Sequence, residues 1–198
     1  MKIYKQETDI SCGVACLRSI FAHYGLEIPE KEILERNEFY KTDSGVMNSI
    51  MSLGITAIKF GFNATYIGYN PMIFRNSNNL NESLNEKLKH YKGYGLFLVQ
   101  RTIEFIKLGG KIKVERLDIE KLKRLADENG FFIADVRPTF YNEKSLFGNV
   151  HKIIVTGYNE KGFIILCPSN AKKEVIDFQP FLMAFYASMP EVLVIKKP

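Results

Sequence analysis

The spacing of apolar residues divides this chain into a helical first part and a strand-rich second part. Apolar side chains recur every three or four residues from Val14 to Tyr24, and Gly25 follows where a helix would stop. Pro29 opens a second short helix, and a third is predicted over residues 46–53. Helices followed by strands predict an α+β fold, in which N-terminal helices pack on an antiparallel sheet.

The second part of the chain consists mainly of short apolar runs separated by turn residues. A helix capped by Asp118 is predicted over 119–128, and another over 180–187. Strands are predicted over 96–100, 131–136, 151–157, 162–166 and 192–195. The turn at 159–162 joins two of these strands into a hairpin.

The composition excludes several classes of protein. Hydrophobic residues make up 46% of the 198 residues, which excludes a disordered chain. No apolar run approaches the roughly 20 residues of a membrane-spanning helix, and the first residues lack the apolar stretch of a signal peptide. We therefore expect a cytoplasmic protein without a membrane span. Its three cysteines are too few and odd in number for a disulfide framework, which raises the question of a functional thiol.

The charge distribution predicts no nucleic-acid partner. The formal net charge is +5, from 27 basic and 22 acidic residues. These charges are interspersed, as over 111–121, and form no basic block.

The strongest chemical signal lies at the start of the first predicted helix. Cys12 falls where that helix begins, and the N–H groups and macrodipole there favour an anion, so we expect a thiol with a lowered pKa. Gly13 lets the backbone pass close to a group that the sulfur attacks. Gln6 lies six residues earlier, and its amide NH₂ can stabilise an oxyanion together with the Cys12 N–H.

A cysteine nucleophile needs a base, and the chain has three histidines. His23 lies on the helix of Cys12, about 16 Å away along the axis, which is out of reach. His90 lies in a polar segment at a predicted helix end. His151 begins a predicted strand, where its side chain can emerge at the end of the sheet. By elimination His151 is the best base.

These residues occur in the pattern Gln-x₅-Cys-Gly-x-x-Cys-Leu, followed by a helix ending in Tyr-Gly and a distant His-x₅-Gly-Tyr hairpin. The pattern resembles the papain-like cysteine peptidases, and more narrowly the double-glycine leader (bacteriocin-processing) peptidases. The matching segments are 6–25, 44–54 and 118–168. The resemblance implies a single papain-like domain over 1–198, with 60–113 an insertion or a divergent region. A polar stretch at 75–86 within that region is predicted to be a loop leading into a helix.

The resemblance also assigns roles to residues. It implies that Cys12 is the nucleophile, His151 the general base and Gln6 the oxyanion donor, acting on a peptide or other amide substrate without a cofactor. The family usually places an Asp-Pro pair after the histidine hairpin, and that Asp orients the imidazole. Here the pair is Cys167-Pro168, and a thiol is a weak acceptor. Asn170 is therefore the candidate that completes the predicted site, with Asp135 as another orienter.

Other readings of the same residues stay open. Four soft ligands could in principle hold zinc, although no Cys-x₂-Cys knuckle is present. They are Cys12, Cys16, His151 and Cys167. A thiol and an imidazole can also pass an acyl group to an amine, as in an acyltransferase or transpeptidase. A third alternative is a catalytically degenerate module that binds peptides.

Overall fold

A computed structural model describes residues 1–43, 45–74, 80–141 and 150–198. The helices of these residues are α1 (Cys12–His23), α2 (Glu30–Arg36), α3 (Ile50–Lys59), α4 (Pro71–Phe74), α5 (Leu80–His90), α6 (Gly93–Lys107), α7 (Ile119–Asn129) and α8 (Phe178–Tyr186), with a 3-10 turn η1 (Pro138–Phe140). The strands are β1 (Tyr40–Thr42), β2 (Gly45–Met47), β3 (Asn63–Gly68), β4 (Lys111–Val114), β5 (Phe132–Val136), β6 (His151–Tyr158), β7 (Gly162–Cys167), β8 (Lys172–Asp177) and β9 (Glu191–Lys196). Ser44 and residues 75–79 of the predicted polar loop lie outside the described residues, as does 142–149.

Within the described residues, one large sheet has the strand order β4-β3-β9-β5-β6-β7-β8, and β1 and β2 form a separate hairpin. Neighbouring strands of the large sheet are antiparallel, apart from the parallel pair of β3 and β4. This architecture confirms the predicted α+β class.

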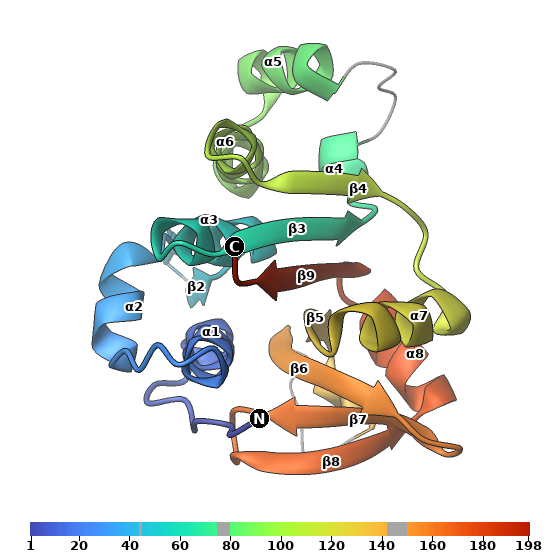
Figure 1. Ribbon diagram of the computed structural model, residues 1–198. Helices are drawn as coiled ribbons and strands as arrows, with labels where there is room; N and C mark the ends of the chain where they lie inside the picture. The colour runs from blue at the N-terminus through green and yellow to red at the C-terminus, as the bar shows by residue number, and fades with distance from the viewer. Residues whose placement is uncertain (44, 75–79, 142–149) are drawn as a thin grey trace.

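Helices cover both faces of the large sheet, as Figure 1 shows. On one face α1 packs against β6, and α3 packs against β3 and β9. On the other face α7 packs against β5 and β6, and α8 against β5, β7 and β8. Two separate apolar clusters result, one on each face of the sheet. Alternate residues of each central strand enter opposite clusters because successive side chains of a strand point to opposite faces.

Several predicted elements are present at nearly the predicted bounds. Asp118 caps α7, since its side chain accepts a hydrogen bond from the Lys121 N–H at 2.8 Å. Gly130 ends that helix with φ +74, a left-handed conformation that favours glycine. The hairpin of β6 and β7 also forms as predicted.

Two predicted elements are wrong. Residues 96–100 are predicted as a strand but belong to α6, whose buried positions recur at helical spacing over a longer stretch: Gly95, Leu98, Val99, Thr102 and Phe105. The third helix begins at Ile50 and continues through Gly54 to Lys59. Gly54 therefore lies inside the helix. A Cβ at this position would lie 2.5 Å from the Phe105 ring, so glycine permits close packing of α3 on α6.

The segment 60–113 contributes to both the sheet and the core. It supplies β3, which pairs with β9, and the edge strand β4. Its helix α6 packs against α3. Helix α5 begins at Leu80, inside the stretch predicted as a polar loop, and continues past the end of that stretch to His90. Among the helices that the structure describes, none has the length and apolar character to cross a membrane.

Candidate active site

Cys12 is the first residue of α1, held by a tight turn before the helix. The hydroxyl of the fully buried Ser11 donates to the Thr8 carbonyl and accepts from the Thr8 N–H, both at 3.0 Å. Cys12 itself is partly exposed, whereas Cys16, one turn further, is fully buried. The backbone N–H groups of Gly13 and Lys152 donate to the Cys12 sulfur. The helix start therefore presents its thiol beside the first residues of β6.

Gln6 lies in an N-terminal segment that is fastened on two sides. Its backbone N–H donates to the Pro168 carbonyl at 2.9 Å, which ties the segment to the end of β7. Its neighbour Glu7 bonds to Arg18 of α1 at 2.8 Å and to Glu30 of α2 at 2.9 Å. The Gln6 side-chain NH₂ donates to the Thr8 carbonyl at 2.8 Å. An amide nitrogen carries two hydrogens, so one remains for a substrate oxygen.

His151, the first residue of β6, contacts Cys167 at the end of the neighbouring strand β7. The His151 Nε2 and Cys167 Sγ atoms lie 3.5 Å apart, and the Cys167 sulfur also lies 3.0 Å from the Ser169 hydroxyl. Burial raises the pKa of the Cys167 thiol, but the hydrogen bonds from His151 and Ser169 outweigh it, so the pKa is lowered. Cys167 thus takes the position next to the imidazole that the resemblance assigns to a carboxylate.

The alternation of side chains separates His151 from Lys152. Ile154, two residues after Lys152, lies in the apolar cluster with Cys16, and Ile153 lies in the cluster with Cys167. The first two side chains of β6 therefore point to opposite faces, with His151 toward Cys167 and Lys152 toward α1. Between Cys12 and His151, which are both described, the structure records no hydrogen bond.

The Cys12 thiol does not have the lowered pKa that its place at a helix start predicts. Burial raises its pKa, and this effect outweighs the charge of Lys152 and the backbone N–H bonds that act in the opposite direction. The expectation is wrong because it counts the helix N-terminus and not the loss of water around the sulfur. For Cys16 the rise is larger still, since burial is complete.

Both orienting residues suggested by the sequence, Asn170 and Asp135, form hydrogen bonds or ion pairs with residues other than His151. The exposed Asn170 donates to the Glu174 carboxylate at 2.6 Å and accepts from the Lys172 N–H at 2.9 Å. Asp135 is paired with Lys152, with Oδ1 and Oδ2 at 3.1 and 3.3 Å from the Lys152 Nζ. Cys167 is therefore the residue that the structure brings to His151.

Sequence reasoning missed a buried polar group beside this site. Asp135 and Lys152 lie directly opposite one another in the register of β5 and β6, so their side chains share a face. Glu191 and Tyr66 form a second buried pair, with the Tyr66 hydroxyl 3.0 Å from the carboxylate. Burial and the charge of Asp135 raise the pKa of Glu191 to about 8. The sequence does show charged residues inside otherwise apolar strands, which is a signal of buried polar contacts. The partners in those contacts become visible only once the pairing of the strands is known.

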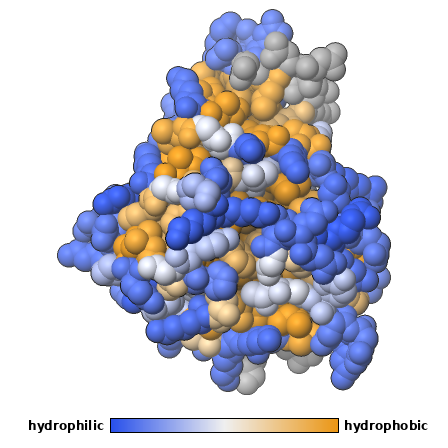
Figure 2. Space-filling view, viewed as in Figure 1, coloured by the Kyte–Doolittle hydropathy of each residue, from blue (hydrophilic) through white to orange (hydrophobic). Residues whose placement is uncertain are grey.

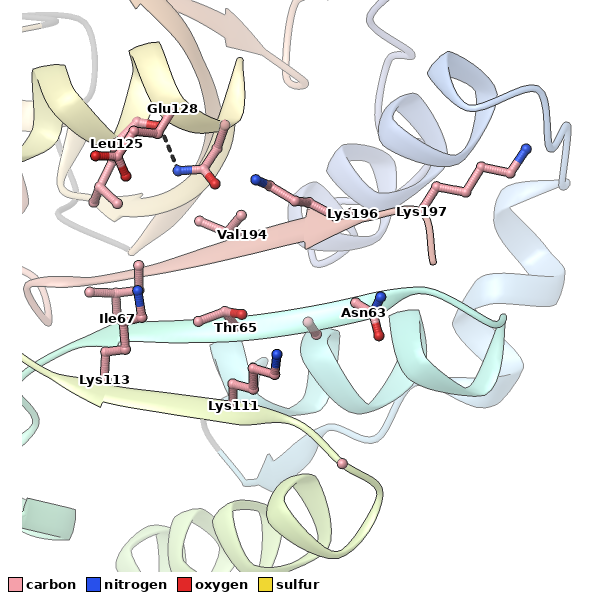
Figure 3. Close-up of a pocket in the computed structure, with 13 residues that line it drawn as sticks. Asn63, Thr65, Ile67, Lys111, Lys113, Leu125, Glu128, Val194, Lys196 and Lys197 are labelled. Atoms are coloured by element: carbon pink, nitrogen blue, oxygen red, sulfur yellow. Dashed lines mark hydrogen bonds between the residues drawn. The ribbon is translucent and has the colours of Figure 1, made fainter.

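A hollow of about 350 Å³ lies apart from these residues, on the exposed face of β4, β3 and β9 and beside α7 (Figure 3). Its lining includes four lysines: Lys111, Lys113, Lys196 and Lys197. Figure 2 shows hydrophilic residues over β9 on this side of the molecule. No cysteine or histidine is among the lining residues, so the hollow does not offer the thiol chemistry of α1.

The zinc reading finds no support in the geometry. Over the described residues, which include all three cysteines and His151, no three His, Cys, Asp or Glu side chains are grouped so as to hold a metal ion. The structure instead uses the three thiols separately: Cys12 at the helix start, Cys16 in the core and Cys167 against His151.

Comparisons with known proteins identify a related family and a shared fold. The model of the Peptidase C39 family matches residues 1–92, which contain Gln6 and Cys12. No curated protein matches the sequence. The match to this family confirms the resemblance to the double-glycine peptidases.

Solved structures show the fold. The peptidase domain of Streptococcus ComA, a bi-functional ABC transporter involved in a quorum-sensing pathway, aligns with a TM-score of 0.54 at 16% identity, over 100% of this chain and 98% of that one. A double-glycine-motif protease from an AMS/PCAT transporter, in complex with the leader peptide, gives 0.53 at 15% identity over 99% and 91%. A C39-like peptidase described from Bacillus anthracis gives 0.58 at 11% identity over 99% and 94%. The fold is therefore the papain-like fold of C39 peptidase domains.

Proposed function

We propose that the protein is a cysteine peptidase-like hydrolase that cleaves peptide or other amide bonds with Cys12 and His151. The observation that carries the proposal is the contact of the first turn of α1 with the start of β6. The Cys16 thiol donates to the Lys152 carbonyl at 3.5 Å, and a Cβ on Gly13 would lie 2.7 Å from the Lys152 Cδ, which puts the residue after His151 beside the turn of Cys12. Catalytic hydrogen bonds are commonly longer in a resting site and shorten when substrate binds. The match of residues 1–92, which include Gln6 and Cys12, to the Peptidase C39 family supports the peptidase class of the proposal.

The chemistry assigns one role to each nitrogen of the imidazole. Nε2 is held by Cys167 at 3.5 Å, so Nδ1 is the nitrogen that accepts the Cys12 proton. The Cys12 sulfur then attacks the carbonyl carbon, and the oxygen becomes an oxyanion. The Cys12 N–H and the second hydrogen of the Gln6 amide stabilise that charge. His151 returns the proton to the departing amine, which leaves a thioester that water hydrolyses to an acid and the free thiol.

The proposed substrate class is supported by a structural neighbour. The related double-glycine-motif protease was solved in complex with a leader peptide. A peptide segment is the substrate we propose for this chain.

Three substitutions test the mechanism. Cys12→Ala and His151→Ala should each abolish turnover of a peptide panel, because the two groups act as a unit. Gln6→Ala should leave activity lower by about 10²–10³-fold, since the backbone donor remains. His90→Ala is the matched control, because His90 is highly exposed on α5. Full activity of His151→Ala would refute the proposed dyad.

The orienter is tested by a separate pair of variants. Cys167→Ala should lower turnover, because Cys167 contacts the imidazole, whereas Asn170→Ala should not, because Asn170 bonds to Glu174. A loss confined to Asn170→Ala would instead make Asn170 the orienter, as the sequence suggested.

The thiol in place of a carboxylate keeps a second function in view. Cys167 stabilises an imidazolium less well than a carboxylate does, which favours slow turnover, or peptide binding without turnover, over fast hydrolysis. Acyl transfer to an amine would use the same thiol and imidazole. Mass spectrometry after incubation with a peptide and an amine separates these functions. A shortened acid indicates hydrolysis, an amide of the added amine indicates transfer, and unchanged but bound peptide indicates a degenerate module.

A further inference from the structure

Lys152 is a buried lysine next to the proposed base. The residue is 3% exposed, and lysine is almost never buried unless it is paired. The Nζ atom donates to the Asn48 carbonyl at 2.7 Å and lies 3.1 Å from Asp135 Oδ1. Burial lowers the pKa of this ammonium, but the charges of Asp135, Cys12 and Tyr94 and the hydrogen bond to Asp135 together outweigh burial and raise the pKa. Lys152 therefore keeps its positive charge inside the protein at neutral pH.

The same lysine touches the first turn of α1 at three places. Its backbone N–H donates to the Cys12 sulfur, and its carbonyl accepts from the Cys16 thiol at 3.5 Å. Its aliphatic stem packs on Gly13, where an added Cβ would lie only 2.7 Å from the lysine Cδ. Both the main chain and the side chain of Lys152 thus fix the position of this turn relative to β6.

We propose that Lys152 is a positioning residue for Cys12, and that its buried ammonium stabilises the thiolate form of that sulfur. The inference rests on the proposed role of Cys12 as the nucleophile. A charge–charge interaction is stronger in a buried site than in water, because few water molecules screen it. Asp135 has two effects: it keeps Lys152 protonated, and it partly offsets the field of the ammonium at the sulfur.

The other ionisable groups near this pair do not replace the lysine. Tyr94 and Glu191 interact electrostatically with both members of this pair, and Cys16 lies one helical turn below Cys12. The imidazole of His151 contacts Cys167, where β6 begins and β7 ends. Among the described side chains, Lys152 is the cation that lowers the pKa of the Cys12 thiol, against the larger effect of burial.

The pH dependence of Cys12 alkylation tests the inference directly. The rate of iodoacetamide labelling, followed at Cys12 by peptide mapping, gives the apparent pKa of the thiol in the whole protein. Lys152→Met should raise that pKa by on the order of one unit, which slows labelling about tenfold below the midpoint. Because a lone buried carboxyl can destabilise this variant, Lys152→Met with Asp135→Asn removes both charges and should raise the pKa as well. Circular dichroism verifies that each variant is folded.

Two controls separate charge from packing. Lys152→Arg keeps a cation in place and should leave the midpoint close to that of the unmodified protein. Lys111→Met removes one charge in the lysine-lined hollow and should not move the midpoint. An unchanged midpoint in the double variant would overturn the proposal, as would an equal rise in Lys111→Met or in Lys152→Arg. The labelling needs no substrate, so failure of peptide cleavage would refute the proposed function without moving this result.

Discussion

Glu191 provides the sharpest test of the buried polar group, because its charge depends on pH within an accessible range. The carboxyl is 5% exposed, its Oε2 accepts from the Tyr66 hydroxyl at 3.0 Å, and burial with the charge of Asp135 raises its pKa to about 8. The folded protein therefore holds a proton on Glu191 between about pH 4.5 and 8, where the unfolded chain has released it. Since the native state binds the extra proton, the free energy of unfolding must fall as pH rises through this window.

The size of that fall follows from linkage. Each pH unit inside the window changes the contribution of one group by up to about 1.4 kcal/mol. Between pH 5.5 and 7.5 the protein should therefore lose on the order of 2 kcal/mol of unfolding free energy through Glu191. Glu191→Gln has no proton to release, and its carbonyl can still accept from Tyr66, so this part of the loss should vanish.

Urea unfolding at the two pH values measures the difference between the unmodified protein and the variant. Contributions of all other groups cancel in that difference when they are unaffected by the substitution. Glu160→Gln, an exposed carboxylate in the β6–β7 turn, is the control and should leave the pH dependence unchanged. If Glu191→Gln lost as much stability as the unmodified protein between pH 5.5 and 7.5, the carboxyl would not be protonated in the fold and the reasoning would fail.

Two further predictions concern the first turn of α1. Iodoacetamide should label Cys12 before the two buried thiols, Cys16 and Cys167, because Cys12 alone of the three is partly exposed. Peptide mapping that finds Cys167 labelled first would contradict this prediction. Gly13→Ala should lower the free energy of unfolding by about 1–2 kcal/mol, measured in urea, since overpacking outweighs the gain in helix propensity. The added Cβ would lie 2.7 Å from Lys152 Cδ and 2.8 Å from Leu53 Cδ1, and a variant as stable as the unmodified protein would show that both side chains can move away.

Much of the fold could be predicted because local signals agree with the tertiary structure. Asp118 and Gly130 mark both ends of α7, and the turn before Gly162 joins β6 to β7. The prediction failed where tertiary packing overrides local signals. Glycine is a local signal for a helix end, but Gly54 lies inside α3, where the Phe105 ring approaches too closely for a larger residue. The strands β3 and β4 depend on pairing with β9 and with each other, which no local pattern reveals.

The sequence predicts which residues form the candidate site, but not the contacts that depend on strand pairing and burial. Cys12, Gln6 and His151 stand out by spacing and by elimination, and Gln6 does lie against the Pro168 carbonyl beside Cys167. The pairing of Asp135 with Lys152 could not be predicted, because a one-residue change in the register of β5 and β6 would bring other side chains together. The pKa of Cys12 was predicted in the wrong direction for a related reason. Burial depends on every element packed around the sulfur, and a helix start does not determine it.

The replacement of a carboxylate by Cys167 and the burial of Lys152 bear on one another. In a thiol–imidazole pair, the imidazolium supplies the charge that stabilises the thiolate, and a carboxylate partner in turn stabilises the imidazolium. Cys167 offers His151 a weakly accepting sulfur at 3.5 Å, so the imidazolium is less well stabilised. Lys152 brings a positive charge to the α1 side of the sheet that does not depend on the protonation of His151. In the proposed mechanism, Lys152 would therefore stabilise the Cys12 thiolate that forms when His151 takes the thiol proton, in addition to the imidazolium that Cys167 supports weakly.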